Sequence, residues 1–167
     1  PPPPPPPLFF STPPPANAMA SGLGGSERCI RDRRTCACTG ARLHLVEPMG
    51  FRLSQKNLAR AGCDYWDEVA IVRWPCAAAF FEACDEEELH LFTGHASRSF
   101  ADAAYGEGAY LVFGRESRGL DREVVDERAE RCVRIPMSDL LRRLNLGNAL
   151  AVDTYEAIRQ QGYPALG

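Results

Sequence analysis

LVFGRESRGL, residues 111–120, is a short apolar run that stops at a glycine and gives way to charged residues. The run from Leu111 to Phe113 suits a buried strand, and Gly114 and Gly119 flank a polar turn. Similar runs, each ended by a turn, alternate along the chain with segments typical of helices. The predicted strands are 41–48, 68–74, 88–94, 109–114 and 132–136, and the predicted helices are 54–62, 75–83, 121–129 and 147–161. This alternation predicts an α/β domain with a mainly parallel sheet and helices on both faces.

The loops that follow three of these strands are the candidate site, because ligands of parallel sheets bind at the carboxyl ends of the strands. These loops are FTGHASRS (92–99), FGRESRG (113–119) and IPMSDLLRRLN (135–145). No G-x-G-x-x-G follows a strand, and neither a P-loop nor a G-x-S-x-G serine elbow occurs in the chain. The pattern therefore disfavours the usual dinucleotide, P-loop and serine-hydrolase classes.

The amino-acid composition limits the size of the folded domain and the kinds of partner that it can bind. With 167 residues, 45% of them hydrophobic, the chain can supply one core of ordinary domain size. It contains no apolar run of about 18 residues that could cross a membrane. The net charge of −3 gives no global attraction to nucleic acid, so any RNA contact must come from a local patch. All the basic residues except Lys56 are arginines, which suits bidentate phosphate contacts but is equally explained by codon bias.

The cysteines indicate a reducing compartment. There are seven of them, an odd number without framework spacing. Cys36 and Cys38 form a C-x-C pair with no second pair at metal-ligand spacing, so no metal site is predicted.

Residues 1–27 differ from the rest of the chain. Seven prolines and a run of small residues predict a disordered tail, with the folded domain at residues 28–167. The tail suits either an organellar transit peptide or a mispredicted coding sequence. We therefore expect a cytoplasmic protein, or an organellar one if the tail is a transit peptide.

Five segments carry a resemblance to a known family. They are LHLVEPMGF, RAGCDYW, LVFGRESRGL, VRIPM and LNLGNALAVDTYEAIRQQGYP, in this order and at these spacings. Over residues 35–164 the chain resembles the SPOUT methyltransferases, and among them the TrmL (YibK-like) tRNA 2′-O-methyltransferases. The resemblance implies a C-terminal deep trefoil knot that holds S-adenosylmethionine, a homodimer, and methylation of the wobble ribose in the anticodon stem-loop of tRNA. DNA is not an expected partner.

The resemblance also implies which residues bind the cofactor: Phe92, Gly114, Ile135 and Arg143. Gly114 has no side chain and would let the backbone approach the cofactor, while Gly119 permits a tight return into the next helix. Arg143 stands where the family usually has serine. It would contact phosphate or crowd the carboxylate end of the cofactor, or it is simply a solvated loop charge.

The implied catalytic residues are Arg34, Glu116 and Asn145. The RTCACTG segment places the family's arginine at Arg34, which would accept the ribose proton or position a phosphate, since a guanidinium is a poor base. Glu116 falls on the family's motif glutamate, although a solvated ion pair with Arg115 or Arg118 is an equally good account. Asn145 suits both an active-site role and the N-cap of the last helix.

The chain departs from the family before Arg34. An opening apolar strand and an Asn-x-Gly turn should precede this arginine, but the segment GSERCIRDRR offers neither, so the N-terminal strand is predicted to be missing. Its loss would expose a sheet edge. One alternative function is therefore a catalytically impaired cofactor-binding or RNA-binding module, and another is an unrelated α/β enzyme for a different nucleotide.

The last helix carries Ala151, Tyr155 and Ile158 at helical spacing. This face would pack onto the sheet or onto a second subunit.

Overall fold

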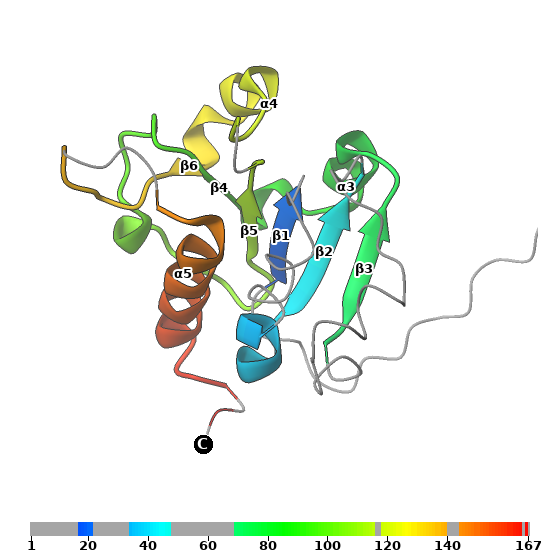
Figure 1. Ribbon diagram of the computed structural model, residues 1–167, viewed down its shortest axis with the longest axis vertical. Coiled ribbons are helices and arrows are strands. Elements are labelled where there is room, and N and C mark those ends of the chain that lie inside the picture. The colour runs from blue at the N-terminus through cyan, green and yellow to red at the C-terminus, as the bar shows by residue number, and fades with distance from the viewer. Residues whose placement is uncertain are drawn as a thin grey trace, which may run out of the picture.

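The computed structural model describes residues 17–21, 34–47, 69–115, 118–139, 144–164 and 166. Within them the strands form a six-stranded sheet in which every pairing is parallel (Figure 1). The spatial order is β3-β2-β1-β5-β4-β6. The strands are β1 (Asn17–Ser21), β2 (Arg42–Val46), β3 (Ile71–Trp74), β4 (Leu89–Phe92), β5 (Tyr110–Phe113) and β6 (Cys132–Val133).

Side chains on both faces of the sheet are buried, which explains why its strands are continuous apolar runs. Leu43 and Leu111 belong to a core cluster that also contains Cys36 and Leu150. Val112 projects to the other face and joins a second cluster. The prediction of a parallel sheet covered on both sides is confirmed.

Helices supply the two outer layers. They are α3 (Ala77–Ala83), α4 (Arg122–Glu127) and α5 (Leu146–Gln160), with a helical turn at residues 34–39 and short 3₁₀ turns η2 (Glu86–Glu88), η3 (Phe100–Asp102) and η4 (Ala129–Arg131). The turn at 34–39 and α5 pack on the first cluster. The other two helices cover the opposite face, where Phe80 of α3 is buried and Val124 of α4 packs beside it. Every predicted helix is found except 54–62, which lies outside the described residues.

The prediction of a missing N-terminal strand is wrong. β1 pairs with β2 from Asn17 to Ser21 and with β5 from Asn17 to Ala20, so it lies inside the sheet. Residues 17–21 were also assigned to the disordered tail, and here they form a strand. The sequence NAMAS lacks the β-branched and aromatic residues that favour strands, so parallel partners on both sides, and not propensity, account for it.

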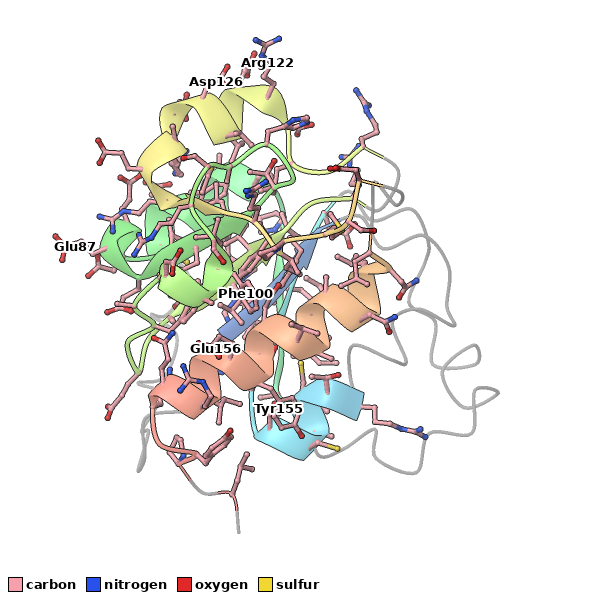
Figure 2. All side chains as sticks on the ribbon, turned by 90° about the vertical axis from the view of Figure 1, so that its left-hand side faces the viewer. Glu87, Phe100, Arg122, Asp126, Tyr155 and Glu156 are labelled. Atoms are coloured by element: carbon pink, nitrogen blue, oxygen red, sulfur yellow. The ribbon has the colours of Figure 1, made fainter. Side chains whose placement is uncertain are left out.

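The outer face of α5 differs from the prediction. Ile158 is fully buried, whereas Tyr155 is 45% exposed, so these two residues do not share one face. Val152 is 44% exposed and lies on the same side of the helix as Tyr155, at i, i+3 spacing. Figure 2 shows Tyr155 on the side of α5 that faces the helical turn at residues 34–39.

The segment after β4 is held between β6 and the end of α5. Arg134, just past β6, donates its backbone N–H to Arg98 and accepts from Phe100, both at 2.9 Å. At the other end of the segment, the Gln160 amide accepts from the Tyr105 N–H at 3.1 Å and donates to the Ala103 carbonyl at 3.0 Å. A stretch far from both elements in sequence is thus fixed against each of them.

None of the helices in the described ranges is both long and apolar enough to cross a membrane.

Candidate functional site

The carboxyl ends of β4, β5 and β6 meet at one edge of the sheet, as parallel strands require (Figure 1). Phe92 and Phe113 end neighbouring strands in register, and their rings stack with centroids 4.6 Å apart. Ile135 follows β6, and like Phe92 it is half-buried against the first core cluster. Two of the four predicted cofactor residues thus line the same apolar edge.

Gly114 is needed for a reason that the sequence did not reveal. A Cβ on this residue would lie 1.9 Å from the carbonyl carbon of Gly119 and 2.0 Å from the Leu120 nitrogen. The returning chain therefore occupies the space beside Gly114. Gly119 has φ +73°, where glycine is favoured, and its carbonyl accepts from the Arg115 N–H at 3.0 Å. The two glycines close a tight turn, and contact of Gly114 with a cofactor stays a prediction.

Open space lies beside the loop after β4. An added Cβ on Gly94 would meet no atom within 4 Å, and the residue is exposed. The loop backbone is nevertheless fixed, because the Thr93 N–H donates to the Val133 carbonyl at 3.0 Å. The loop after β4 is therefore held at Thr93 and exposed to solvent at Gly94.

Asn145 begins α5 at the same edge (Figure 1). Its side-chain oxygen accepts from the Gly147 N–H at 3.1 Å, which confirms the predicted cap. The next residue, Leu146, is half-buried on the same core cluster as Phe92 and Ile135. The helix start thus lies close to the predicted cofactor residues.

Within one chain, Arg34 does not lie at the strand-end loops. It is the exposed first residue of the helical turn at 34–39, which lies beside the later turns of α5 (Figures 1 and 2). Asn145 is at the opposite end of that helix. Among the described residues no hydrogen bond joins Arg34 to Asn145, so a single chain does not bring these two predicted catalytic residues together.

Glu116 and Arg143 lie outside the described residues. Their neighbours define the turn around Glu116: Arg115 is half-buried, and Arg118 is exposed and donates its backbone N–H to the Arg115 carbonyl at 3.2 Å.

The buried histidines are structural. Burial lowers the pKa of His44 to about 4, and Trp74 Nε1 donates to its Nδ1 at 3.0 Å. Burial also lowers the pKa of His90 to about 4, with Arg98 and Arg131 nearby, and its ring packs on Tyr105. Both imidazoles are therefore neutral near pH 7, and neither lies at the strand-end loops.

One buried ionisable residue escaped the sequence analysis. Asp153 lies on the core side of α5 with no exposed surface, and neither carboxylate oxygen has a hydrogen-bond partner among the described residues. The sequence does indicate this burial, because Asp153 lies three residues from the apolar position 150 and four residues from the apolar positions 149 and 157. An acid in that register is a core residue.

Comparisons with known proteins place this architecture among the RNA methyltransferases. Residues 33–155 match the SpoU rRNA Methylase family, and the chain belongs to this family. It is 45% identical over 132 residues to the tRNA (cytidine(34)-2'-O)-methyltransferase of Escherichia coli strain K12, covering 78% of this chain and 84% of that protein. The resemblance seen in the sequence is thereby confirmed.

Solved structures agree. A structure from a study of the 2-OH methylation of C/U34 on tRNA superposes with a TM-score of 0.82 at 37% identity, covering 92% of this chain and 94% of that one. The SpoU methyltransferase AviRb from Streptomyces viridochromogenes, in complex with the cofactor AdoMet, has a TM-score of 0.74 at 20% identity, covering 87% of this chain and 57% of that one. The second likeness concerns the fold alone.

Proposed function

We propose that this protein methylates the 2′-hydroxyl of the wobble nucleotide of tRNA, a cytidine or uridine, with S-adenosylmethionine as methyl donor. The observation that carries the proposal is the 45% identity to the Escherichia coli enzyme of that activity, which extends over most of both chains. The strand-end site supports it, because its apolar wall and open loop lie where a parallel sheet binds ligands.

The residues at this edge fit the cofactor. The Phe92 ring and Ile135 offer an apolar wall for adenine, and no described atom crowds the exposed Gly94 in the loop after β4. When bound, S-adenosylmethionine supplies an electrophilic methyl group on a sulfonium. The chain must orient the ribose hydroxyl in line with that methyl, exclude water, and provide a group that accepts the proton.

Four side chains are proposed to serve the reaction or to hold the cofactor. Asn145 already holds a fixed orientation through its cap, so its amide N–H groups are positioned at the edge where the ribose would bind. Arg34, through its planar guanidinium, would hold the ribose phosphate or accept the proton. Glu116 and Arg143 keep the roles that the family resemblance implies, at the motif glutamate and at the carboxylate end of the cofactor.

A knot in the C-terminal region is part of the proposal. The segment 98–106 forms hydrogen bonds with the residue after β6 on one side, and with Gln160 of α5 and the following Gln161 on the other. The chain from Arg134 to Gln160 thus passes against a loop formed much earlier in the sequence. These contacts support the proposed threading, since a threaded C-terminus would pack against such an earlier segment.

We also propose a homodimer. Val152 and Tyr155 leave apolar surface on the outer face of α5, and Leu144 before the helix is 39% exposed. Arg34 lies beside the later turns of α5, away from Asn145 (Figure 1). A second copy packed on α5 would cover the apolar face and could bring its own Arg34 to the first copy's strand-end site. Sedimentation equilibrium at micromolar concentration should give a dimer, and a monomer would contradict this part of the proposal.

The activity test uses labelled S-adenosylmethionine and tRNA transcripts with cytidine at the wobble position. Methyl incorporation should create one phosphodiester that resists nuclease cleavage, because the 2′-oxygen next to it is blocked. The control transcript carries 2′-deoxycytidine at that position and should accept no methyl group. Incorporation that persists in the control would place the reaction at another nucleotide and reject the proposal.

Two pairs of variants test the residues. Asn145→Ala removes the cap and should cost about 1 kcal/mol of stability, whereas Asn145→Asp keeps a capping oxygen and should not. Both should lower methyl transfer by roughly 100-fold or more if the amide N–H groups serve catalysis. Arg34→Ala should lower transfer similarly at little cost in stability, and Arg34→Lys tests whether charge alone suffices. If Arg34→Ala loses only a few-fold, Arg31 and Arg33 become the candidates.

A further inference from the structure

The charged residues of the sheet are separated between its two edges. An acidic group (Asp85, Glu86, Glu87 and Glu88) immediately precedes β4, at the amino end of that strand, and all but Glu88 are exposed. At the carboxyl ends of β5 and β6 lie three arginines, which we call the arginine rim: Arg115, Arg118 and Arg134. The net charge of −3 does not prevent these three arginines from forming a local basic patch.

The rim arginines differ from other arginines of the described residues in their ion pairing. Arg128 and Arg159 form ion pairs with glutamates, at 3.2 Å and 2.8 Å. No ion pair joins a rim arginine to any carboxylate in the described part of the chain, and both Arg118 and Arg134 are exposed. Arginines that no described carboxylate pairs with can donate their N–H groups to a phosphate ligand.

The backbone under the rim is rigid. Arg115 and Arg118 are held in one turn by the Arg118 N–H to Arg115 carbonyl bond and by the pairing of Arg115 with Gly119. Arg134 is fixed by its pairing with residues 98–100. β4 alone separates β5 from β6, so the two arginine positions stand about 10 Å apart, at two strand spacings. Long arginine side chains at this spacing can reach successive phosphates of one strand.

Arg98 is different from the rim residues. Its guanidinium donates to the Asp102 carbonyl at 2.8 Å and so holds the η3 turn. We assign it a structural role.

We propose that the arginine rim is the surface that binds the ribose-phosphate backbone of the substrate RNA, independently of base sequence. The proposal rests on the proposed function and extends it, because it states which face of the molecule the RNA approaches. The rim borders the loops after β5 and β6, on either side of the loop with free space beside Gly94, so bound backbone would run past the site. The acidic group at the other end repels a polyanion and thereby orients its approach.

The test compares wild-type protein with the triple variant Arg115→Gln, Arg118→Gln, Arg134→Gln. Binding of an unmodified anticodon stem-loop RNA is measured without S-adenosylmethionine over a range of salt concentrations. Each lost phosphate contact lowers the slope of log K against log salt by roughly 0.7, so the triple variant should lose about 2. Stem-loops with wobble cytidine or wobble guanosine should be weakened by the same factor, because phosphate contacts carry no sequence information.

Arg73→Gln is the matched control. Arg73 is an exposed arginine of the edge strand β3, far from β5 and β6 in the sheet order, and its replacement changes net charge without touching the rim. Its slope should stay at the wild-type value. An unchanged slope in the triple variant would overturn the proposal, as would an equal loss per charge in Arg73→Gln. Far-ultraviolet circular dichroism and calorimetric binding of S-adenosylmethionine show whether the triple variant is folded; if it is not, the three single variants replace it, each expected to lose about 0.7.

The two proposals fail separately. A wild-type protein that transfers no methyl group, together with a slope that falls in the triple variant, would reject the methyltransferase activity and retain the RNA surface. Normal methyl transfer by the wild-type protein, together with unchanged RNA binding by the triple variant, would retain the methyltransferase activity and reject the RNA surface.

Discussion

Replacing Asp153 with asparagine should remove a pH dependence from the stability of this protein. The carboxyl group is fully buried against the core side of α5, and neither oxygen has a hydrogen-bond partner among the described residues. Burial raises the pKa of Asp153 from its ordinary value of 3.8 to about 8. The folded protein therefore holds a proton on Asp153 at neutral pH, while the unfolded chain does not.

The sign and size follow from this difference. Because the folded state binds the extra proton, the free energy of unfolding falls as pH rises from about 4 to about 8. The slope is at most about 1.4 kcal/mol per pH unit, which gives roughly 2–3 kcal/mol between about pH 5.5 and about pH 7.5. His44 and His90 act in the opposite sense, since their lowered pKa values add stability as pH rises from about 4 to 6.5. Wild type and Asp153→Asn both contain these histidines, so the difference between their free energies of unfolding reports on Asp153 alone.

Urea unfolding followed by circular dichroism at several pH values measures the effect. The stability of wild type relative to Asp153→Asn should decline by roughly 2–3 kcal/mol across that range, because asparagine matches the volume of aspartate and does not titrate. The other nearby ionisable groups, Tyr105 and Glu156, do not titrate between about pH 5.5 and about pH 7.5. Burial raises the pKa of Tyr105, and the hydrogen bond between Glu156 and Arg159 lowers the pKa of Glu156. A constant difference between the two proteins would refute the reasoning and show that the carboxyl has a solvent path or a partner.

Two further pairs of variants test the packing around the site. Gln160→Ala removes partly buried bonds to the Tyr105 N–H and the Ala103 carbonyl, so it should cost about 1–3 kcal/mol in urea unfolding. Gln161→Ala removes one exposed bond and should cost less than about 0.5 kcal/mol; equal losses would contradict the role of the first bond pair. Gly114→Ala should lower the melting temperature and weaken S-adenosylmethionine binding in calorimetry, since its Cβ would overlap the returning chain. Gly94→Ala has free space and should leave the melting temperature unchanged, so a similar drop in both would argue against the tight turn.

The elements with strong local signals could be predicted from the sequence. β4 and β5 are apolar runs closed by glycine or a polar turn, and α5 has both an Asn145 cap and a core-facing period. β1 could not be found in this way, because an alanine-rich pentapeptide has no strand propensity of its own. Its place depends on the strands at either side, which are distant in sequence.

The candidate site was predictable in position and less so in detail. Parallel topology alone placed it at the loops after β4, β5 and β6, and the structure brings Phe92, Ile135 and Asn145 to that edge. The steric reason for Gly114 needed the path of the returning chain, since Gly119 approaches it only in the folded turn. The proposed threading of the C-terminus likewise has no signal in local patterns, because it concerns the order in which distant segments cross.

The position of β1 bears on whether the site is complete. The impaired-module alternative assumed that the first strand was lost, yet β1 is the link between β2 and β5, and without it the sheet would divide into two parts. Ala20 pairs with Phe113, so the next residue, Ser21, stands level with Gly114 at the carboxyl edge. The chain therefore leaves β1 at the same edge as the loop that contains Glu116. Because β1 is present and ends at this edge, loss of the first strand is no longer a ground for doubting activity.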